Sequence, residues 1–270
     1  MIVIVGCLAG WLLLAKEEVK EPTKAQLALL EKVYYEFENF EYIPDEFPFE
    51  WEGPYREKFE QLCGRKLDLD LTVQTNYFQT PSETLKRKEG DCEDFAILFV
   101  SAAKSIGISA RVVMGSIQGP KDPKPIDHTW SEIYYKGKWR IVDPDLVVEK
   151  MEIPFRKFID HPEEFPVVKV DCRFDDKIVE GISPIEQCEA EADRCKKEAF
   201  DFLIYVFRNE KGREPFEKEV NEIREAAEDL HNQQWVIVLT GIPEDPRILI
   251  QPDNPEVKAW IEEIKMEPKG

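Results

Sequence analysis

Positive charge is scarce in this sequence. Its 270 residues contain 36 Lys and Arg against 55 Asp and Glu, which gives a formal net charge of -19 at pH 7 and an isoelectric point near 4.7. Such a surface would repel the phosphates of a nucleic acid. The basic residues are scattered apart from Lys86, Arg87 and Lys88, which we interpret as a solvated helix face. The composition therefore excludes nucleic acid as an expected partner.

Histidine is also scarce, with 3 residues at His128, His161 and His231. None of them stands at the spacing of zinc ligands, and the 6 cysteines form no Cys-x-x-Cys pair. Because a structural zinc site needs four Cys or His ligands in such spacings, none is expected here. The sequence predicts no metal and no cofactor.

Long hydrophobic runs are missing after the N-terminus. The one apolar run covers residues 2–15 and ends at Lys16. This is short for a membrane-spanning helix and suits the core of a signal peptide or a short membrane anchor. We therefore expect residues 1–16 to be a signal or anchor segment and the protein to be exported or membrane-anchored, outside the cytoplasm. A cytoplasmic protein is the alternative.

Export would permit disulfide bonds. Four of the cysteines could then form two bridges, with Cys92 left free. The four are Cys63, Cys172, Cys188 and Cys195. Cys188 and Cys195 lie seven residues apart on an expected helix, about 10 Å of rise, too far for a bond between them.

What is present is the composition of a globular protein, with 43% hydrophobic and 11% aromatic residues and no internal repeat. One stretch is unusual, "TPSETLKRKEGDCEDFAILFVSAAKSIG". Its start is a helix-capping box, with Thr80 as N-cap, Pro81 at the first helical position and Glu83 at the third. This first helix is expected to be short and to end by Gly90.

Asp91 is placed to cap a second helix, which puts Cys92 in its first turn. Gly107 supplies the stop at the other end. Between them a buried stripe recurs at helical spacing, at Ala96, Phe99, Val100, Ala103 and Ile106. The sequence therefore predicts a half-buried helix that carries a thiol at its tip.

Further on, "ARVVMGSI" has the pattern of a strand and "HTWSEIYYKGKWRIVDP" that of a hairpin turning at Lys136 and Gly137. With a two-residue loop, His128 falls opposite Asp145 and diagonally across from Asp143. Such diagonal neighbours are about 7 to 8 Å apart and within reach of two side chains. A three-residue loop would put them on opposite faces.

A thiolate is a competent nucleophile, and a helix N-terminus lowers the pKa of a thiol. The neighbours Asp91, Glu93 and Asp94 act in the opposite direction, so a cationic partner is needed. Of the histidines, His128 alone is expected on a strand with a carboxylate at the right diagonal. The three carboxylates could also bind calcium, but helix capping and the helix dipole explain them more simply.

These residues predict acyl-transfer chemistry. Cys92 attacks a carbonyl, His128 takes and returns the proton, and Asp143 fixes the tautomer of the imidazole and stabilises its cation. The oxyanion would be bound by the backbone N–H of Cys92 and one side-chain donor, for which Gln79 and Gln74 are the candidates.

Two stretches together resemble the core of the transglutaminase-like superfamily. They are "QTPSETLKRKEGDCEDFAILFVSAAKSIGISARVVMG" and "HTWSEIYYKGKWRIVDP", and the resemblance covers roughly Val73 to Asp145. It implies a papain-like fold and makes Cys92, His128 and Asp143 similar to the family's Cys-His-Asp triad. Gln79 occupies a position before Thr-Pro where family members often have an aromatic residue.

The expected fold class is α+β, a helix with an N-terminal cysteine packed on an antiparallel sheet, with extra helical segments at both ends. Residues 21–170 are expected to form the transglutaminase-like catalytic domain. Residues 171–270 are expected to form a mainly helical C-terminal region with a short hairpin made by "WVIVLTGI" and "RILIQP". The oligomeric state is left open.

Two classes of function follow. The first is a thiol enzyme that acts on amides of a peptide or protein through an acyl-Cys92 intermediate. Hydrolysis, as in a cysteine peptidase or amidase, is favoured over transfer to an amine, because no feature indicates an amine site. The alternative is a non-catalytic transglutaminase-like binding module on the cell surface. A disulfide-built structural domain would require Cys92 to be bridged.

Overall fold

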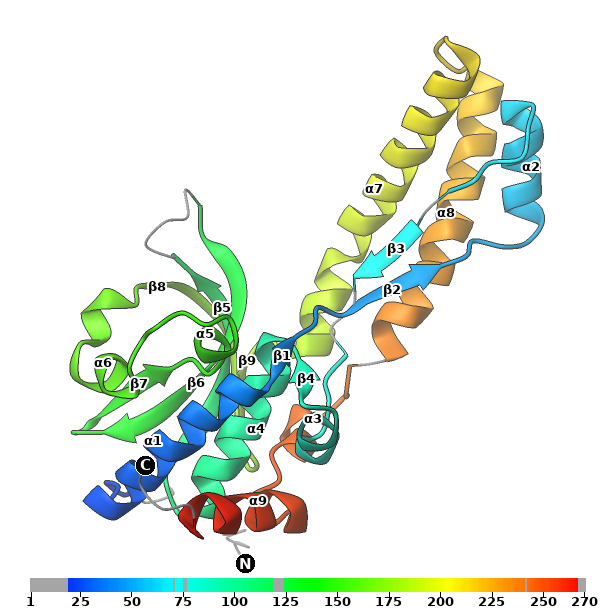
Figure 1. Ribbon diagram of the computed structural model, residues 1–270. Helices are drawn as coiled ribbons and strands as arrows, with labels where there is room; N and C mark the ends of the chain where they lie inside the picture. The colour runs from blue at the N-terminus through cyan, green and yellow to red at the C-terminus, as the bar shows by residue number, and fades with distance from the viewer. Residues whose placement is uncertain (1–18, 70, 75–76, 119–123, 241, 267–270) are drawn as a thin grey trace, which may run out of the picture.

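The computed structural model describes residues 19–69, 71–74, 77–118, 124–240 and 242–266. The expected signal or anchor segment, residues 1–16, lies outside the described residues. Figure 1 shows a body, in which a sheet lies beside a central helix, and an arm of long helices that projects from it. Among the described residues, no helix is both long and apolar enough to span a membrane.

The body is built on one antiparallel sheet of five strands. Their order is β7-β6-β5-β8-β9. The strands are β5 (Ala110–Ile117), β6 (Ile126–Tyr135), β7 (Lys138–Val142), β8 (Val167–Phe174) and β9 (Val179–Gly181). A helix packed on an antiparallel sheet confirms the predicted α+β class.

Helix α4 (Cys92–Ser105) is the centre of the body, and its apolar side chains are almost completely buried. It packs against β5 and β6 and is covered by α1, α3, α5 and α9. These are α1 (Lys24–Glu36), α3 (Pro81–Arg87), α5 (Asp145–Val148) and α9 (Pro255–Met266). Burying a side chain such as Phe99 contributes about 1.5–3 kcal/mol, so the N-terminal turn of α4 rests on a rigid support.

The hairpin of β6 and β7 has the predicted two-residue loop. Tyr135 pairs with Lys138, and Lys136 and Gly137 have φ angles of 52° and 74°. Two left-handed residues in succession form the tight turn that matches the twist of the flanking strands. This register places residues 128 and 143 on the same face.

Smaller elements complete the body. They are η1 (Phe37–Asn39), β1 (Glu41–Tyr42), β4 (Glu89–Gly90), α6 (Phe155–Asp160), η2 (Pro162–Glu164) and η3 (Pro246–Leu249). Strand β1 pairs in parallel with β4, and Tyr42 lies opposite Gly90. This pairing brings the N-terminal part of the chain next to the start of α4.

The arm has its own hydrophobic core, which contains Trp51, Phe59, Leu203 and Phe207. Its elements are α7 (Pro184–Lys211), α8 (Glu217–Thr240), α2 (Pro54–Cys63), β2 (Glu46–Phe49) and β3 (Leu71–Gln74). Helices α7 and α8 pack side by side, and α2 and the β2–β3 pair lie along α8 (Figure 1).

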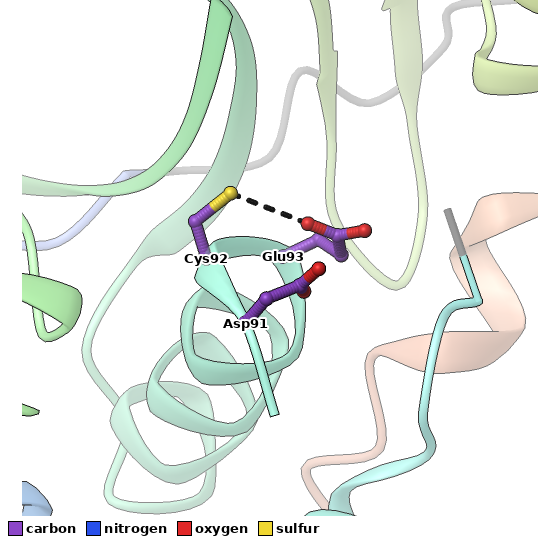
Figure 2. A group of neighbouring side chains, drawn as sticks. All are labelled: Asp91, Cys92 and Glu93. Carbon is purple, nitrogen blue, oxygen red and sulfur yellow. Dashed lines mark hydrogen bonds between the residues drawn. The ribbon is translucent and has the colours of Figure 1, made fainter. Parts of the chain in front are cut away.

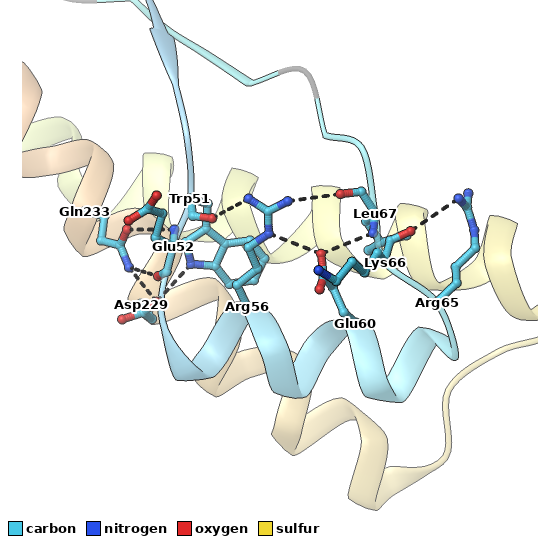
Figure 3. Close-up of polar contacts among 9 residues, drawn as sticks. All are labelled: Trp51, Glu52, Arg56, Glu60, Arg65, Lys66, Leu67, Asp229 and Gln233. Atoms are coloured by element: carbon cyan, nitrogen blue, oxygen red, sulfur yellow. Dashed lines mark hydrogen bonds and ion pairs between the residues drawn. The ribbon is translucent and has the colours of Figure 1, made fainter.

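Polar contacts fasten α2 and its flanking loops to the arm (Figure 3). The indole N–H of Trp51 donates to Asp229 of α8 at 2.9 Å. Arg56 donates to the carbonyls of Trp51 and Leu67 at 2.6 and 3.0 Å. A surface groove of about 900 Å³ is lined by residues between Trp51 and Leu67 and by none from the Cys92 region.

The predicted C-terminal hairpin is wrong. "WVIVLT" continues α8 to Thr240, and "RILI" begins in the 3-10 helix η3. β-branched residues favour strands only weakly, whereas a helix that has already formed gains one hydrogen bond for each added residue. The expected boundary between residues 170 and 171 also falls inside β8.

The two bridges that export would permit among four of the cysteines do not form. Cys63 and Cys172 carry free thiols, and they lie in the separate cores of the arm and the body. Two bridges among the four candidate cysteines would need both of them. Cys92 carries a free thiol, as expected.

Candidate active site

Cys92 is the first residue of α4, and Asp91 is its N-cap. The preceding helix α3 begins with the predicted capping box, in which Thr80 accepts from the N–H of Glu83 and Glu83 accepts from that of Thr80. Cys92 is partly exposed. The cysteine therefore stands at the expected helix tip.

Asp94 ties the starts of α3 and α4 together. Its carboxylate accepts from the backbone N–H and from the side-chain amide of Gln79, both at 2.7 Å. It also accepts from the N–H of Asp91 at 3.4 Å. A Cβ on Gly90 would lie 2.6 Å from the same carboxylate, so only glycine leaves room for this contact.

The proposed oxyanion donors are placed differently from each other. Gln79 is 2% exposed and its amide is bound to Asp94, so it acts here as a link between α3 and α4. Gln74 is the last residue of β3 and pairs with Glu46; its side chain lies outside the described part of the structure. The backbone N–H at the start of α4 stays the donor that the helix geometry supports.

His128 and Asp143 form the predicted pair. Nε2 of His128 lies 2.7 Å from Oδ2 of Asp143, and both side chains are buried. Burial is the largest single influence on the pKa of His128 and lowers it, but the charge and hydrogen bond of Asp143, together with Asp145 and Glu149, raise it to about 9. The imidazole ring of His128 is stacked with the ring of Trp130, at 6.4 Å between the ring centroids. His128 is thus a stable cation at neutral pH.

The thiol lies against strand β6, at the residue that follows His128. Helix α4 packs on β6, and the hydroxyl of Ser131 on β6 donates to the carbonyl of Ala96 on α4 at 3.4 Å. The backbone of Thr129, the residue after His128, hydrogen-bonds the thiol of Cys92 and lowers its pKa. The structure therefore brings Cys92 to the position on β6 that adjoins His128.

Carboxyl groups dominate the immediate surroundings of Cys92 (Figure 2). The thiol donates to Oε2 of Glu93 at 3.2 Å. Burial, followed by Glu93, Asp91 and Asp145, raises the pKa of Cys92 well above its usual value. Burial also raises the pKa values of these three carboxyl groups, that of Asp145 to about 8. Asp145 therefore holds its proton at neutral pH and repels a thiolate less than a full charge would.

Two groups of side chains bring potential metal ligands within 4.8 Å of one another, namely Asp91, Cys92 and Glu93, and His128, Asp143 and Asp145. Calcium takes six to eight oxygen ligands, and neither group supplies that number. In the second group the hydrogen bond between His128 and Asp143 already occupies two of the atoms. That the site binds no metal stays a prediction.

Two residues near the thiol carried no role in the sequence prediction. Tyr42 is placed opposite Gly90 by the β1–β4 pairing, and burial and then Cys92 raise its pKa. No sequence pattern predicts this pairing of two-residue strands. The position of Asp145 near His128 could have been predicted, because the hairpin register places the two residues opposite each other.

Comparison with known proteins agrees with this geometry. Residues 57–144 match the transglutaminase-like superfamily, and this part of the chain contains Cys92, His128 and Asp143. The match confirms the predicted resemblance and begins earlier than expected, in α2. This segment is therefore similar to the core of that superfamily.

No curated protein matches the chain. Among solved structures, it is similar to a provisionally assigned cysteine protease from Cytophaga hutchinsonii, with 20% identity and a TM-score of 0.28. The similarity covers 57% of this chain and 43% of that one. The chain thus spans less than half of that protein, and the low TM-score carries no function across.

Proposed function

We propose that the protein is a thiol enzyme that cleaves amide bonds of peptides or proteins through an acyl-Cys92 intermediate. The observation that carries this proposal is the pair of His128 and Asp143, 2.7 Å apart and buried, on the strand whose next residue, Thr129, bonds the thiol of Cys92 at a helix N-terminus. A nucleophile, a base and a group that orients the base are the parts that acyl transfer needs.

In the proposed reaction, Cys92 reacts as the thiolate of a thiolate–imidazolium pair: the thiol proton resides on His128, and the sulfur forms a bond to the substrate carbonyl carbon. The backbone N–H groups at the start of α4 stabilise the oxyanion. The imidazolium then donates its proton to the leaving amine as the C–N bond breaks, and water releases the acid and regenerates the thiol.

Hydrolysis is proposed in preference to transfer to an amine. Cys92 is partly exposed, which gives water access to the acyl group, and water competes with any amine that is not held in a dry site. An exported or membrane-anchored location, predicted from residues 1–16, is part of the proposal, as is a peptide or protein substrate.

The test is to trap the acyl-enzyme. The protein is incubated with a diverse peptide library, quenched in acid and digested, and the mass of the peptide that contains Cys92 is measured. We expect acyl adducts on wild type and none on Cys92→Ser or His128→Ala. Adding a primary amine during turnover separates the two outcomes, because hydrolysis yields free acids and transfer yields amides. A wild type without adducts contradicts the proposal.

A non-catalytic binding module is the second candidate. It is favoured by one observation, the hydrogen bond from the thiol of Cys92 to Glu93, which stabilises the protonated, unreactive form. Under this alternative, the library would yield peptides that stay bound without modification, and Cys92→Ser would retain them.

A further inference from the structure

Asp145 lies in the site with no assigned role. It is the first residue of α5 and follows Asp143 by two positions. Its side chain is 5% exposed. One of its carboxylate oxygens, a ring nitrogen of His128 and a carboxylate oxygen of Asp143 all lie within 4.8 Å of one another. The imidazole therefore has a second buried acid beside it.

An ordinary structural role does not explain this acid. No side-chain hydrogen bond caps α5, whose N-cap is Pro144. The Oδ1 atoms of Asp145 and Asp143 are both buried without a hydrogen-bond partner in the described structure. A buried carboxylate oxygen without a partner is costly. A buried group that carries such a cost calls for an explanation, and a catalytic role is one of the recognised ones.

The charges that face Asp145 come from several elements. Burial and then Asp143 raise its pKa, to about 8, while His128 lowers it. Asp145 in turn raises the pKa of His128 and of Cys92. The other titratable groups in this network are Asp91 at the tip of α4, Glu149 after α5 and Tyr42 on β1.

We propose that Asp145 is a positioning residue for the thiol reaction, a second acidic partner that holds the protonated imidazole of His128 beside Cys92. This inference rests on the proposed function. Asp143 accepts from Nε2, and a carboxylate oxygen of Asp145 lies within 4.8 Å of a ring nitrogen. The site thus contains two carboxylates for one imidazole where acyl transfer needs one.

The contributions of Asp143 and Asp145 to the stability of the imidazolium depend on pH. Below about pH 8 Asp145 is protonated, and Asp143 alone stabilises the cation. Above that pH Asp145 is ionised and adds its charge, which keeps the proton on His128 up to about pH 9. An opposite charge within about 4–6 Å shifts a pKa by about 1 to 3 units. Removing Asp145 should therefore release the proton of His128 at a lower pH.

The test measures the pKa of His128 by NMR titration of the imidazole signals, which are few because the chain has 3 histidines. In Asp145→Asn we expect the pKa of His128 to fall by about one unit, the lower end of the range for such a charge. The midpoint of Cys92 alkylation should also move to lower pH, because Asp145 raises the thiol pKa. A structural role would not move both values together.

Three variants serve as controls. Glu149→Gln removes an exposed charge near the same helix and should change the pKa of His128 much less, because solvent screens it. Asp145→Glu keeps the charge and should keep most of the raised pKa. If Asn is not accommodated, Asp145→Ser is a second neutral variant, and the dispersion of the NMR spectrum reports whether each protein is folded.

A folded Asp145→Asn protein in which His128 titrates as in wild type overturns the inference. This result is separate from a failure of the proposed function, because the imidazole titration does not need a reactive thiol. If wild-type Cys92 fails to react while Asp145→Asn still lowers the pKa of His128, the enzyme proposal is wrong. The inference that Asp145 stabilises the protonated His128 is then retained.

Discussion

Nε2 of His128 and Oδ2 of Asp143 lie 2.7 Å apart, at the open end of the β6–β7 hairpin. The relationship depends on a two-residue turn, because one extra residue would move Asp143 to the other face of the sheet. It leaves the imidazole oriented by a buried carboxylate. The chemistry proposed for Cys92 depends on this pair.

The first prediction concerns Asp143. In Asp143→Asn the largest raising effect is lost, while burial, which lowers the pKa, and the smaller raising effects of Asp145 and Glu149 remain. We expect the pKa of His128 to fall from about 9 toward its usual value of 6.5. NMR titration measures this, with His231 as an internal reference whose pKa burial lowers in both proteins. A raised pKa that persists in the variant would assign the effect to another group.

The second prediction separates the two roles considered for Gln79. Gln79→Ala removes a donor from the completely buried Asp94, and an unsatisfied buried group costs about 1–3 kcal/mol. We expect that loss in the free energy of unfolding, measured with urea, while the exposed Gln61→Ala stays close to wild type. Normal stability with a lost acyl-enzyme would instead make Gln79 the oxyanion donor.

The third prediction is that stability falls from pH 5 to pH 9. Asp94 and Asp145 have pKa values of about 8 instead of 3.8, and His128 about 9 instead of 6.5. In this window the native protein holds protons that the unfolded chain has released, so the free energy of unfolding decreases by about 1.4 kcal/mol per pH unit for each such proton.

Thermal melts across that pH range check the sign, and Asp145→Asn isolates one of the protons. The variant should show a shallower decline below pH 8, because its folded state no longer binds the proton of Asp145. A stability that rises between pH 5 and pH 9 would mean that these carboxyl groups are ionised in the native state.

The fourth prediction concerns the arm. Trp51→Phe removes the 2.9 Å bond to Asp229, and a hydrogen bond to a charged group contributes about 1.5–3 kcal/mol. Gln233 still donates to Asp229, so we expect a loss near the lower end of that range. A double-mutant cycle of Trp51→Phe with Asp229→Asn measures the coupling. Additive losses would show that packing, and not this bond, fixes α2.

The site was largely predictable because its parts are local. The capping box at Thr80, the helix start at Cys92 and the turn at Lys136 and Gly137 are each specified by a few neighbouring residues. The turn alone sets the register that brings Asp143 to His128. These signals act over short separations, so tertiary contacts do not override them.

The remainder depends on contacts distant in sequence. The bonds between Gln79 and Asp94 join two helix starts, and the pairing of Tyr42 with Gly90 joins segments about fifty residues apart. The end of α8 was predicted as a strand because its β-branched residues fit either structure. Two bridges among the four candidate cysteines would have had to include both Cys63 and Cys172, which lie in two separate cores.

The most direct test of the central claim is the rate of Cys92 alkylation by iodoacetamide between pH 5 and pH 9, in wild type and in His128→Ala, with the modified site read by mass spectrometry. An imidazolium partner predicts labelling below pH 7 that is at least about tenfold faster in wild type, the ratio for a one-unit fall in thiol pKa. Equal rates in the two proteins, both following an ordinary thiol with a pKa near 8.5 or higher, would contradict a thiolate activated by His128.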